Sequence, residues 1–307
     1  MRDLIIIGGG PAGLSAGIYA VRSGLDAVII ESMAPGGQVI KTAEVENYPG
    51  FENSISGFEL ISGMEKQARR LGTEVEIAEI TSVHRDDERD CIVCTASSGN
   101  IYEAKAVIAA TGSKYKHLEV PGETELTGRG VSYCATCDGA FFRDKITAVV
   151  GGGNTALDEA LFLTRFASKV YIIHRRDRFR ASKILVDRAL SNEKIEPVYN
   201  AVVTSINGRE KVESVSLAGT ADGRQWELAT DGLFIFIGFL SLTEILPDSI
   251  KNEWGQIKTD CHMRTEIPGI YAAGDIRTDS RKQIVTAAAD GATAAMSAYE
   301  YITHDML

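Results

Sequence analysis

A glycine-rich motif that occurs twice limits the folds open to this chain of 307 residues more than any other feature. The first copy reads Gly-Gly-Gly-Pro-Ala-Gly at residues 8–13, and the second reads Gly-Gly-Gly-Asn-Thr-Ala at residues 151–156. Each copy follows an apolar, β-branched run and precedes an apolar helical pattern, as in a dinucleotide-binding βαβ unit. The chain is long enough for two such units, each with its own core. We therefore predict two nucleotide-binding domains.

The first copy carries every part of the dinucleotide fingerprint. A predicted strand over residues 3–7 leads into Gly8, which permits a tight turn. Gly10 lets the backbone approach a pyrophosphate, and Gly13 lets the following helix pack on the strand. Free N–H groups at the start of that helix favour phosphate binding. The next predicted strand ends in Glu31, whose carboxylate is placed to accept hydrogen bonds from ribose hydroxyls.

The second copy differs from the first at the end of its second strand. A predicted strand over residues 145–150 leads into Gly151 and Gly153, and the unit ends with His-Arg-Arg at 174–176, followed by Arg180. A carboxylate at this place would repel a 2′-phosphate, whereas guanidinium groups bind it in forked geometry. The pattern predicts NADP(H), with a solvated basic turn as the alternative.

A close pair of cysteines lies between the two glycine motifs. Cys134 and Cys137 are followed at once by Asp138. In a reducing compartment such a pair is catalytic or metal-binding more often than structural. Its place between two nucleotide sites predicts electron flow from a nicotinamide, through a second cofactor, to a disulfide.

A second Cys-x-x-Cys, formed by Cys91 and Cys94, raises the possibility of a four-cysteine zinc site. This pair lies in the β-branched run 90–96, which predicts a strand. Residues three apart on a strand point to opposite faces, so neither a shared metal nor a mutual disulfide fits. We interpret Cys91 and Cys94 as ordinary strand residues and predict no metal site.

Composition narrows the function classes further. The net charge of −10 argues against non-specific nucleic-acid binding. No apolar run approaches the roughly 20 residues that span a bilayer, and the apolar N-terminal run is too short for the core of a signal peptide. The five cysteines are too few and scattered for a secreted disulfide framework. We predict a cytoplasmic protein without membrane contact.

The remaining pattern indicates how the domains are connected. We predict a helix over residues 58–71, one strand over 74–83, and a buried strand over 105–112 that ends in Thr-Gly. The polar, irregular stretch 114–130 indicates a crossing into a second domain, and 238–246 indicates the crossing back.

Near the C-terminal end, a predicted strand over residues 269–273 leads into Gly-Asp, and an alanine-rich helix begins near Gln283. The carboxylate of Asp275 is placed to hold the polyol chain of a cofactor, and the positive end of the helix favours an anionic ring. The amides of Gln38 and Asn47 lie in loop-rich stretches, where they either face a cofactor or satisfy loop backbone.

Taken together, these motifs resemble low-molecular-weight, bacterial-type thioredoxin reductase, a class II pyridine nucleotide-disulfide oxidoreductase, over essentially the whole chain. The resemblance is carried by both glycine motifs, Ala-Thr-Gly at 110–112, Cys-Ala-Thr-Cys-Asp-Gly at 134–139, the arginine cluster, and Ala-Gly-Asp at 273–275. Their order and spacing are highly specific.

The resemblance implies an α/β fold of two Rossmann-like (three-layer ββα) dinucleotide-binding domains, the second inserted into the first. Residues 1–113 and 246–307 would form a discontinuous FAD-binding domain. Residues 114–245 would form the NADPH-binding domain that carries the redox dithiol. The family is homodimeric with one FAD per subunit, and its inserted domain rotates about the crossings near Lys114 and Phe239.

The resemblance also assigns site residues. The residues on FAD-contacting motifs are Gly8, Gly10, Gly13, Glu31, Gly37, Gln38, Asn47, Thr111, Gly274, Asp275, Lys282 and Gln283. The residues on NADPH motifs are Gly151, Gly153, Asn154, Thr155, His174, Arg175, Arg176 and Arg180. Lys282 stands where the family commonly has arginine, so the charge is kept and the guanidinium fork is lost.

The implied activity is NADPH-dependent thioredoxin-disulfide reduction. Hydride passes to FAD, electrons pass to the Cys134–Cys137 disulfide, and the dithiol reduces thioredoxin or a similar dithiol protein. Our hypothesis is that Cys137 faces the flavin, Cys134 attacks the partner disulfide and Asp138 is the acid/base, with a helix or turn cap as the alternative for Asp138. The rival functions are a ferredoxin-dependent flavin thioredoxin reductase and a non-catalytic nucleotide-binding redox sensor.

Overall fold

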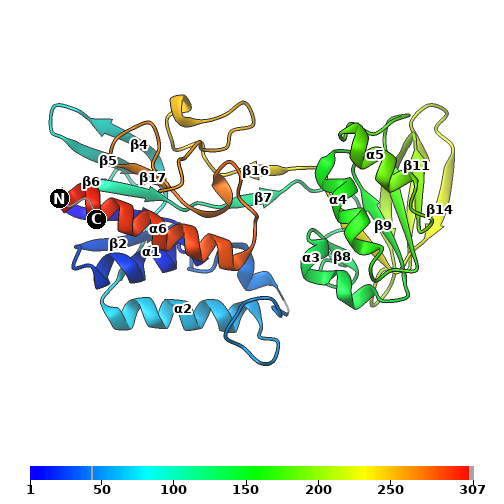
Figure 1. Cartoon of the computed structure of the whole chain (residues 1–307), viewed down its shortest axis with the longest axis horizontal. Coiled ribbons are helices and arrows are strands. Elements are labelled where there is room, and N and C mark those ends of the chain that lie inside the picture. The colour runs from blue at the N-terminus through cyan, green and yellow to red at the C-terminus, as the bar shows by residue number, and fades with distance from the viewer. Residues whose placement is uncertain (43, 304–307) are drawn as a thin grey trace. The chain divides into compact units, whose positions relative to one another are not determined.

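The computed structural model describes residues 1–42 and 44–303, and the chain divides into two compact units. The first unit comprises residues 1–114 and the chain from residue 240 onward, and the second is Tyr115–Phe239. The second unit is therefore inserted into the first, as predicted (Figure 1). The predicted boundary at residue 245 differs from the structural one at Phe239.

The first unit is built on a mixed sheet with the strand order β3-β2-β1-β6-β5-β4, and β17 also pairs with β6. Its parallel strands are β1 (Arg2–Ile7), β2 (Ala27–Glu31), β3 (Glu74–Ile77), β6 (Ile101–Ala109) and β17 (Ile270–Ala272). Its antiparallel strands are β4 (Ile80–Asp86) and β5 (Cys91–Ala96), which pair beside β6. Its α-helices are α1 (Pro11–Arg22), α2 (Gly57–Leu71) and α6 (Ile284–Thr303).

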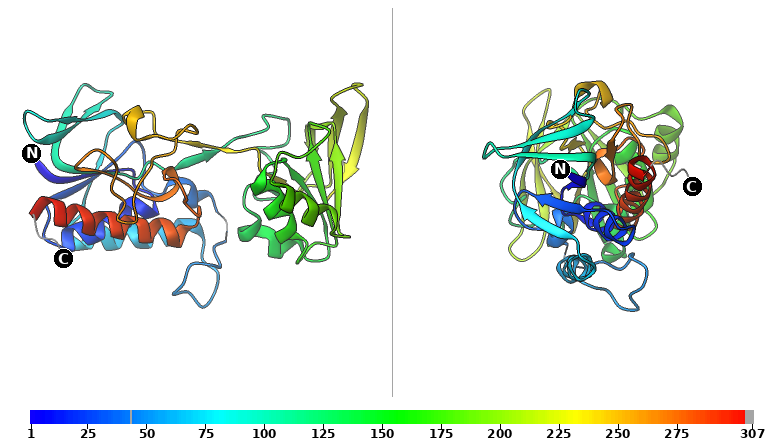
Figure 2. Two further views of the ribbon diagram at one scale, coloured as in Figure 1. Left: turned by 45° about the horizontal axis from the view of Figure 1, so that its top comes forward. Right: turned by 90° about the vertical axis from the view of Figure 1, so that its left-hand side faces the viewer.

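Alternating side chains of the parallel strands pack into two separate cores, one on each face of the sheet. In β1, Leu4 and Ile6 pack with the helices, whereas Ile5 and Ile7 pack with β4, β5 and the chain around Ile257. Because strand side chains alternate between faces, covering both faces requires an unbroken apolar run. Figure 2 shows α1 and α6 side by side on one face of the sheet. The predicted three-layer arrangement is confirmed.

The prediction of one strand over residues 74–83 is wrong. The structure has two strands, β3 and β4, separated at residues 78–79. β3 pairs with β2 at one end of the sheet order, and β4 pairs with β5 at the other. The apolar–polar alternation shifts by one residue at Ile77 and Ala78, which is a local sign of the break, but it does not indicate which partners the two strands take.

The second unit repeats the three layers. Its parallel sheet, in the order β11-β10-β9-β15-β8, comprises β8 (Val131–Ser132), β9 (Ile146–Val150), β10 (Lys169–His174), β11 (Ile195–Tyr199) and β15 (Gly232–Ile235). One face carries α3 (Ala135–Asp138), α4 (Asn154–Leu163) and α5 (Lys183–Leu190). The other face carries the antiparallel sheet β12 (Ala201–Asn207), β13 (Ser214–Gly219) and β14 (Gln225–Ala229).

The two connections between the units pair with each other as a short sheet, β7 (Ser113–Tyr115) with β16 (Phe239–Ser241). The 3-10 helices are η1 (Gly37–Lys41), η2 (Gly139–Phe142), η3 (Asp248–Ile250) and η4 (Gly274–Ile276). Across the described ranges 1–42 and 44–303, none of the helices is long and apolar enough to cross a membrane.

Candidate active site and nucleotide-binding sites

Cys134 and Cys137 form a disulfide, with 5.3 Å between their Cα atoms. Cys134 is the N-cap residue of α3, and Cys137 lies within its single turn. Residues three apart on a helical turn share one face, which brings the two sulfurs together. The Cys137 side chain is exposed and that of Cys134 is half-buried. By contrast, Cys91 and Cys94 are buried free thiols in β5, and burial raises the pKa of the Cys94 thiol to about 12.

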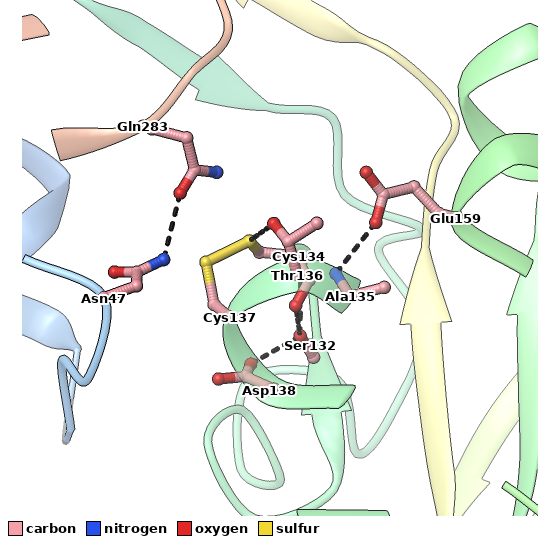
Figure 3. The surroundings of a disulfide bond; sticks show 9 residues. All are labelled: Asn47, Ser132, Cys134, Ala135, Thr136, Cys137, Asp138, Glu159 and Gln283. Atoms are coloured by element: carbon pink, nitrogen blue, oxygen red, sulfur yellow. Dashed lines mark hydrogen bonds between the residues drawn. A yellow bond between two sulfur atoms is a disulfide. The ribbon is translucent and has the colours of Figure 1, made fainter. Parts of the chain in front are cut away.

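Asp138 lies directly beside the disulfide and contacts a serine that the sequence motif does not assign (Figure 3). Ser132 Oγ donates a hydrogen bond to Asp138 Oδ2 at 2.5 Å and accepts one from the Cys134 amide at 3.1 Å. Burial raises the pKa of the Asp138 carboxyl above its usual value, and the bond from Ser132 opposes the rise. A carboxyl that protonates more readily than usual suits proton transfer to and from sulfur.

A second carboxylate contacts the same turn from α4. Glu159 Oε2 accepts a hydrogen bond from the Ala135 amide at 3.2 Å (Figure 3). The Thr136 amide is also hydrogen-bonded to this carboxylate. Sequence reasoning missed Glu159. Its spacing from Ala156 and Leu163, both fully buried, places it near the buried face of the helix, and this was the available signal.

The second unit holds a cavity of about 530 Å³ beside the second glycine motif. Of the predicted NADPH residues, the cavity is lined by Gly151, Gly153, Thr155, His174, Arg175 and Arg180. Gly153 is the N-cap of α4 and offers no side chain to the first-turn amides, so these remain available to a phosphate. The cavity thus joins a helix N-terminus to two guanidinium groups.

The other two predicted NADPH residues do not line this cavity. Asn154 Oδ1 accepts a hydrogen bond from the Ser182 amide at 2.8 Å, which ties the start of α4 to the start of α5. Arg176 is exposed, and its carbonyl accepts a bond from the Asn200 amide. His174 is buried, and burial lowers its pKa, with the nearby Arg180 charge adding to the effect.

In the first unit, the predicted residues gather where the parallel strands end. A Cβ on Gly8 would lie 2.4 Å from the Ala110 carbonyl oxygen, and one on Gly13 would lie 1.8 Å from the Gly8 carbonyl oxygen. Gly8 also has a φ of +108°, which favours glycine. The segment at residues 36–37 approaches the motif, since the Gly36 amide donates to the Gly9 carbonyl at 2.8 Å. These close approaches explain the glycines of the motif.

Polar side chains surround this strand end. Glu31 Oε2 accepts a hydrogen bond from the Gly9 amide at 2.7 Å, and Thr111 Oγ1 donates to the Leu242 carbonyl. Asn47 Nδ2 donates to Gln283 Oε1 at 3.1 Å, so two amides that are far apart in the sequence meet. Gln38 lies exposed in η1.

The side chain of Lys282 contacts the backbone of Asp275. Lys282 Nζ donates to the Asp275 carbonyl oxygen at 3.2 Å. Burial raises the pKa of Asp275, and the positive charge of Lys282 opposes this rise. Burial lowers the pKa of Lys282, and the negative charge of Asp275 opposes this fall. Gly274, next to Asp275, donates its amide to Asp290 Oδ2 at 3.1 Å.

Comparison with known proteins agrees with this geometry. The pattern of the pyridine nucleotide-disulphide oxidoreductase family matches residues 2–291. Thioredoxin reductase of Bacillus subtilis is 49% identical over 302 residues, covering 98% of this chain and 94% of that protein. Thioredoxin reductase of Treponema pallidum is 46% identical over 300 residues, covering 98% and 97%. The crystal structure of thioredoxin reductase from Streptococcus pyogenes superposes with a TM-score of 0.93 at 45% identity, covering 99% of each chain.

The chain therefore belongs to the pyridine nucleotide-disulphide oxidoreductase family. Within that family it groups with the bacterial-type thioredoxin reductases, oxidoreductases that bind FAD and use NADPH. The predicted resemblance is confirmed.

The residues present fit both cofactors. Gly10 and Gly153 each begin a helix without a side-chain cap, and a Cβ on either would meet no atom within 4 Å, so each backbone is open to a pyrophosphate. In the second unit, the buried His174 Nε2 has no hydrogen-bond partner among the described residues and belongs to a cavity-lining side chain. A polar ligand there would satisfy it. Within the same ranges, no three His, Cys, Asp or Glu side chains gather as a metal site.

Proposed function

We propose that this chain is an NADPH-dependent thioredoxin-disulfide reductase. The observation that carries the proposal is the Cys134–Cys137 disulfide beside Asp138, in the same unit as the arginine-lined cavity. FAD, when bound, accepts hydride from NADPH and passes an electron pair to a disulfide, which a nicotinamide does not reduce readily by itself.

The cysteines perform the thiol–disulfide exchange. With the disulfide reduced, the Cys134 thiolate attacks one sulfur of the partner disulfide, forms a mixed disulfide and expels the partner's other sulfur as a thiolate. Cys137 then attacks Cys134, which restores the Cys134–Cys137 bond and releases the reduced partner. Asp138 accepts a proton from the attacking thiol or supplies one to the leaving thiolate, and Ser132 orients the carboxylate.

Each unit binds one of the two cofactors. In this proposal the second unit binds NADPH, with the phosphates at the N-terminus of α4 and the 2′-phosphate at Arg175 and Arg180. The first unit binds FAD where β1, β2 and β6 end, with Glu31 on the ribose. From the family resemblance alone, Asn154 and Arg176 remain proposed contacts of NADPH, and Gln38 and Lys282 remain proposed contacts of FAD.

The NADPH-dependent reductase is better supported than either rival, a reductase fed by ferredoxin or a non-catalytic redox sensor. A reductase fed by ferredoxin needs no intact NADPH site, whereas this chain has an uncapped helix N-terminus and two arginines at one cavity.

We further propose a cytoplasmic homodimer. The dimer rests on the family resemblance, and the compartment rests on three free thiols, at Cys91, Cys94 and Cys261.

The test is turnover of NADPH with oxidised thioredoxin by cysteine variants. Cys134→Ser and Cys137→Ser should each lose thioredoxin reduction by at least about a thousandfold, because dithiol exchange needs both sulfurs. Cys261→Ser, at an exposed free thiol remote in sequence from the disulfide, serves as the matched control and should keep wild-type turnover. Thioredoxin reduction that survives in either of the first two variants would refute the proposal.

A further inference from the structure

Glu159 is a carboxylate that reaches the redox turn from another element, α4. It extends from α4, half-buried, and its Oε2 accepts from the Ala135 amide at 3.2 Å. The Thr136 amide is hydrogen-bonded to the same carboxylate. The contact is supported by packing, since Ala135 is fully buried in the same core as Leu157 and Ala160 of α4. Figure 3 shows Glu159 hydrogen-bonded to Ala135 of the turn, whereas Asp138, the last residue of the turn, is hydrogen-bonded to Ser132 of β8.

The amides that Glu159 occupies are those at the start of α3. The N-cap residue, Cys134, provides no side-chain cap for them. First-turn amides with no partner stabilise anions, and a thiolate placed there has a lowered pKa. Stabilising the thiolate stabilises the reduced form, which makes a disulfide more oxidising. Here the donors are already bound to a carboxylate, whose negative charge also opposes a thiolate nearby.

We propose that Glu159 is a positioning residue of the redox centre, which occupies the Ala135 and Thr136 amides and thereby keeps the Cys134–Cys137 dithiol strongly reducing. This role matches a dithiol that must donate electrons to a partner, and it rests on the proposed function. The same helix begins at the proposed NADPH pyrophosphate site, so α4 links the nucleotide end of the second unit to the sulfurs. Burial, with the Asp158 charge adding to it, raises the pKa of Glu159, and the two amide bonds oppose the rise.

The experiment equilibrates the full-length holoenzyme with dithiothreitol buffers of graded ratio, followed by alkylation and mass spectrometry of Cys134 and Cys137. In this equilibrium reduced dithiothreitol passes two electrons and two protons to the protein, its own disulfide forming as the Cys134–Cys137 bond breaks. Glu159→Gln retains an acceptor oxygen and removes the charge. We expect it to shift the equilibrium about tenfold toward the dithiol, which is about 30 mV for a two-electron couple.

Asp158→Asn is the matched control, because Asp158 is the neighbouring carboxylate on α4 and is exposed. It should shift the equilibrium less than about twofold. Glu159→Ala, which removes both charge and acceptor, should shift it in the same direction as Glu159→Gln. An equilibrium that Glu159→Gln leaves within twofold of wild type would overturn the proposal, and so would an equal shift in Asp158→Asn.

This measurement separates the two proposals, because dithiothreitol replaces thioredoxin. If wild-type protein fails to reduce thioredoxin, the proposed function fails while the Glu159 shift remains measurable. If thioredoxin turnover is normal and the Glu159→Gln equilibrium is unchanged, only the role of Glu159 is refuted. Retention of flavin absorbance in each variant establishes that the fold is intact.

Discussion

Glu123 is a carboxylate that the second unit buries together with its hydrogen-bond donors. Only 3% of its surface is exposed. The Tyr133 hydroxyl donates to Oε1 at 2.7 Å, and the amides of Leu118 and Glu119 donate at 3.1 and 2.7 Å. Burial opposes ionisation, but these bonds together outweigh it and lower the pKa of Glu123. Because Tyr133 precedes Cys134, this network anchors the strand that leads into the redox turn.

We predict that Glu123→Gln destabilises the second unit by about 1–3 kcal/mol at neutral pH. A carboxyl with a lowered folded pKa contributes stability above its unfolded pKa, and that stability is lost as the pH falls through the folded pKa. The difference between wild type and variant should therefore shrink below about pH 4.5, the ordinary glutamate value.

Urea unfolding in a Trp254→Phe background measures this difference, because Trp226 of β14 then reports on the second unit alone. Glu125→Gln, at an exposed carboxylate nearby, is the control and should change stability by less than about 0.5 kcal/mol. A Glu123→Gln effect that is constant from neutral to acid pH would contradict the assignment.

Asp138→Asn tests the proton-transfer role next to the disulfide. We predict that it slows thioredoxin turnover about 10²- to 10⁴-fold while FAD and NADPH remain bound. Since the pKa of Asp138 is raised, its proton-donating form persists to higher pH than in a free aspartate, and turnover through that form falls as the pH rises through this pKa. Stopped-flow kinetics over a pH series should show that limb in wild type and lose it in the variant. Wild-type rates in the variant would restrict Asp138 to a capping role.

Among single residues, the sequence predicted the site residues that lie in motifs and missed those that a second element brings to the site. Cys134, Cys137 and Asp138 are contiguous, so their spacing alone predicted the centre. The helical spacing of Glu159 placed it near a buried face, but its contact with the centre depends on the packing of α3 on α4, which no local pattern encodes.

At the scale of elements, the approach of α1 and α6 decides how the first unit is packed. A Cβ on Gly291 of α6 would lie 2.0 Å from the Ala12 carbonyl oxygen of α1. The two helices therefore come together through a position where only glycine fits. Ala12 lies in the first turn of α1, within the first glycine motif, so this packing supports the proposed FAD site.

We predict that Gly291→Ala destabilises the first unit by about 1–3 kcal/mol, because the added methyl must displace one helix. Gly63→Ala is the matched comparison. Gly63 is an exposed position in α2 where a Cβ would meet no atom within 4 Å, and alanine there should stabilise by up to about 1 kcal/mol. Release of FAD on heating, followed by flavin fluorescence, reports on this unit. Equal release temperatures for the two variants would contradict the packing argument.

Elements with a strong local signal were predicted, and those defined by distant pairing were not. The strand–glycine–helix units follow from periodicity, and α1 begins at Pro11 because proline is well suited to a first turn. The separation of β3 from β4 depends on which strands each one joins, and α5 (Lys183–Leu190) was not predicted at all.

At the scale of the whole molecule, one chain carries two three-layer units, and the disulfide and the arginine-lined cavity belong to the inserted one. The electron path proposed here therefore enters and leaves through the second unit and requires FAD in the first. The rotation of the inserted unit about β7 and β16 stays a prediction from the family resemblance.

The measurement that tests this account most directly is anaerobic titration of the purified yellow protein, followed by its flavin absorbance. NADPH should bleach the absorbance and NADH should bleach it much less, because Arg175 and Arg180 favour the 2′-phosphate. Oxidised thioredoxin added next should restore the absorbance in wild type and fail to do so in Cys137→Ser. Protein that stays colourless when FAD is supplied, or thioredoxin that restores the absorbance without Cys137, would contradict the proposed path of electrons through the disulfide.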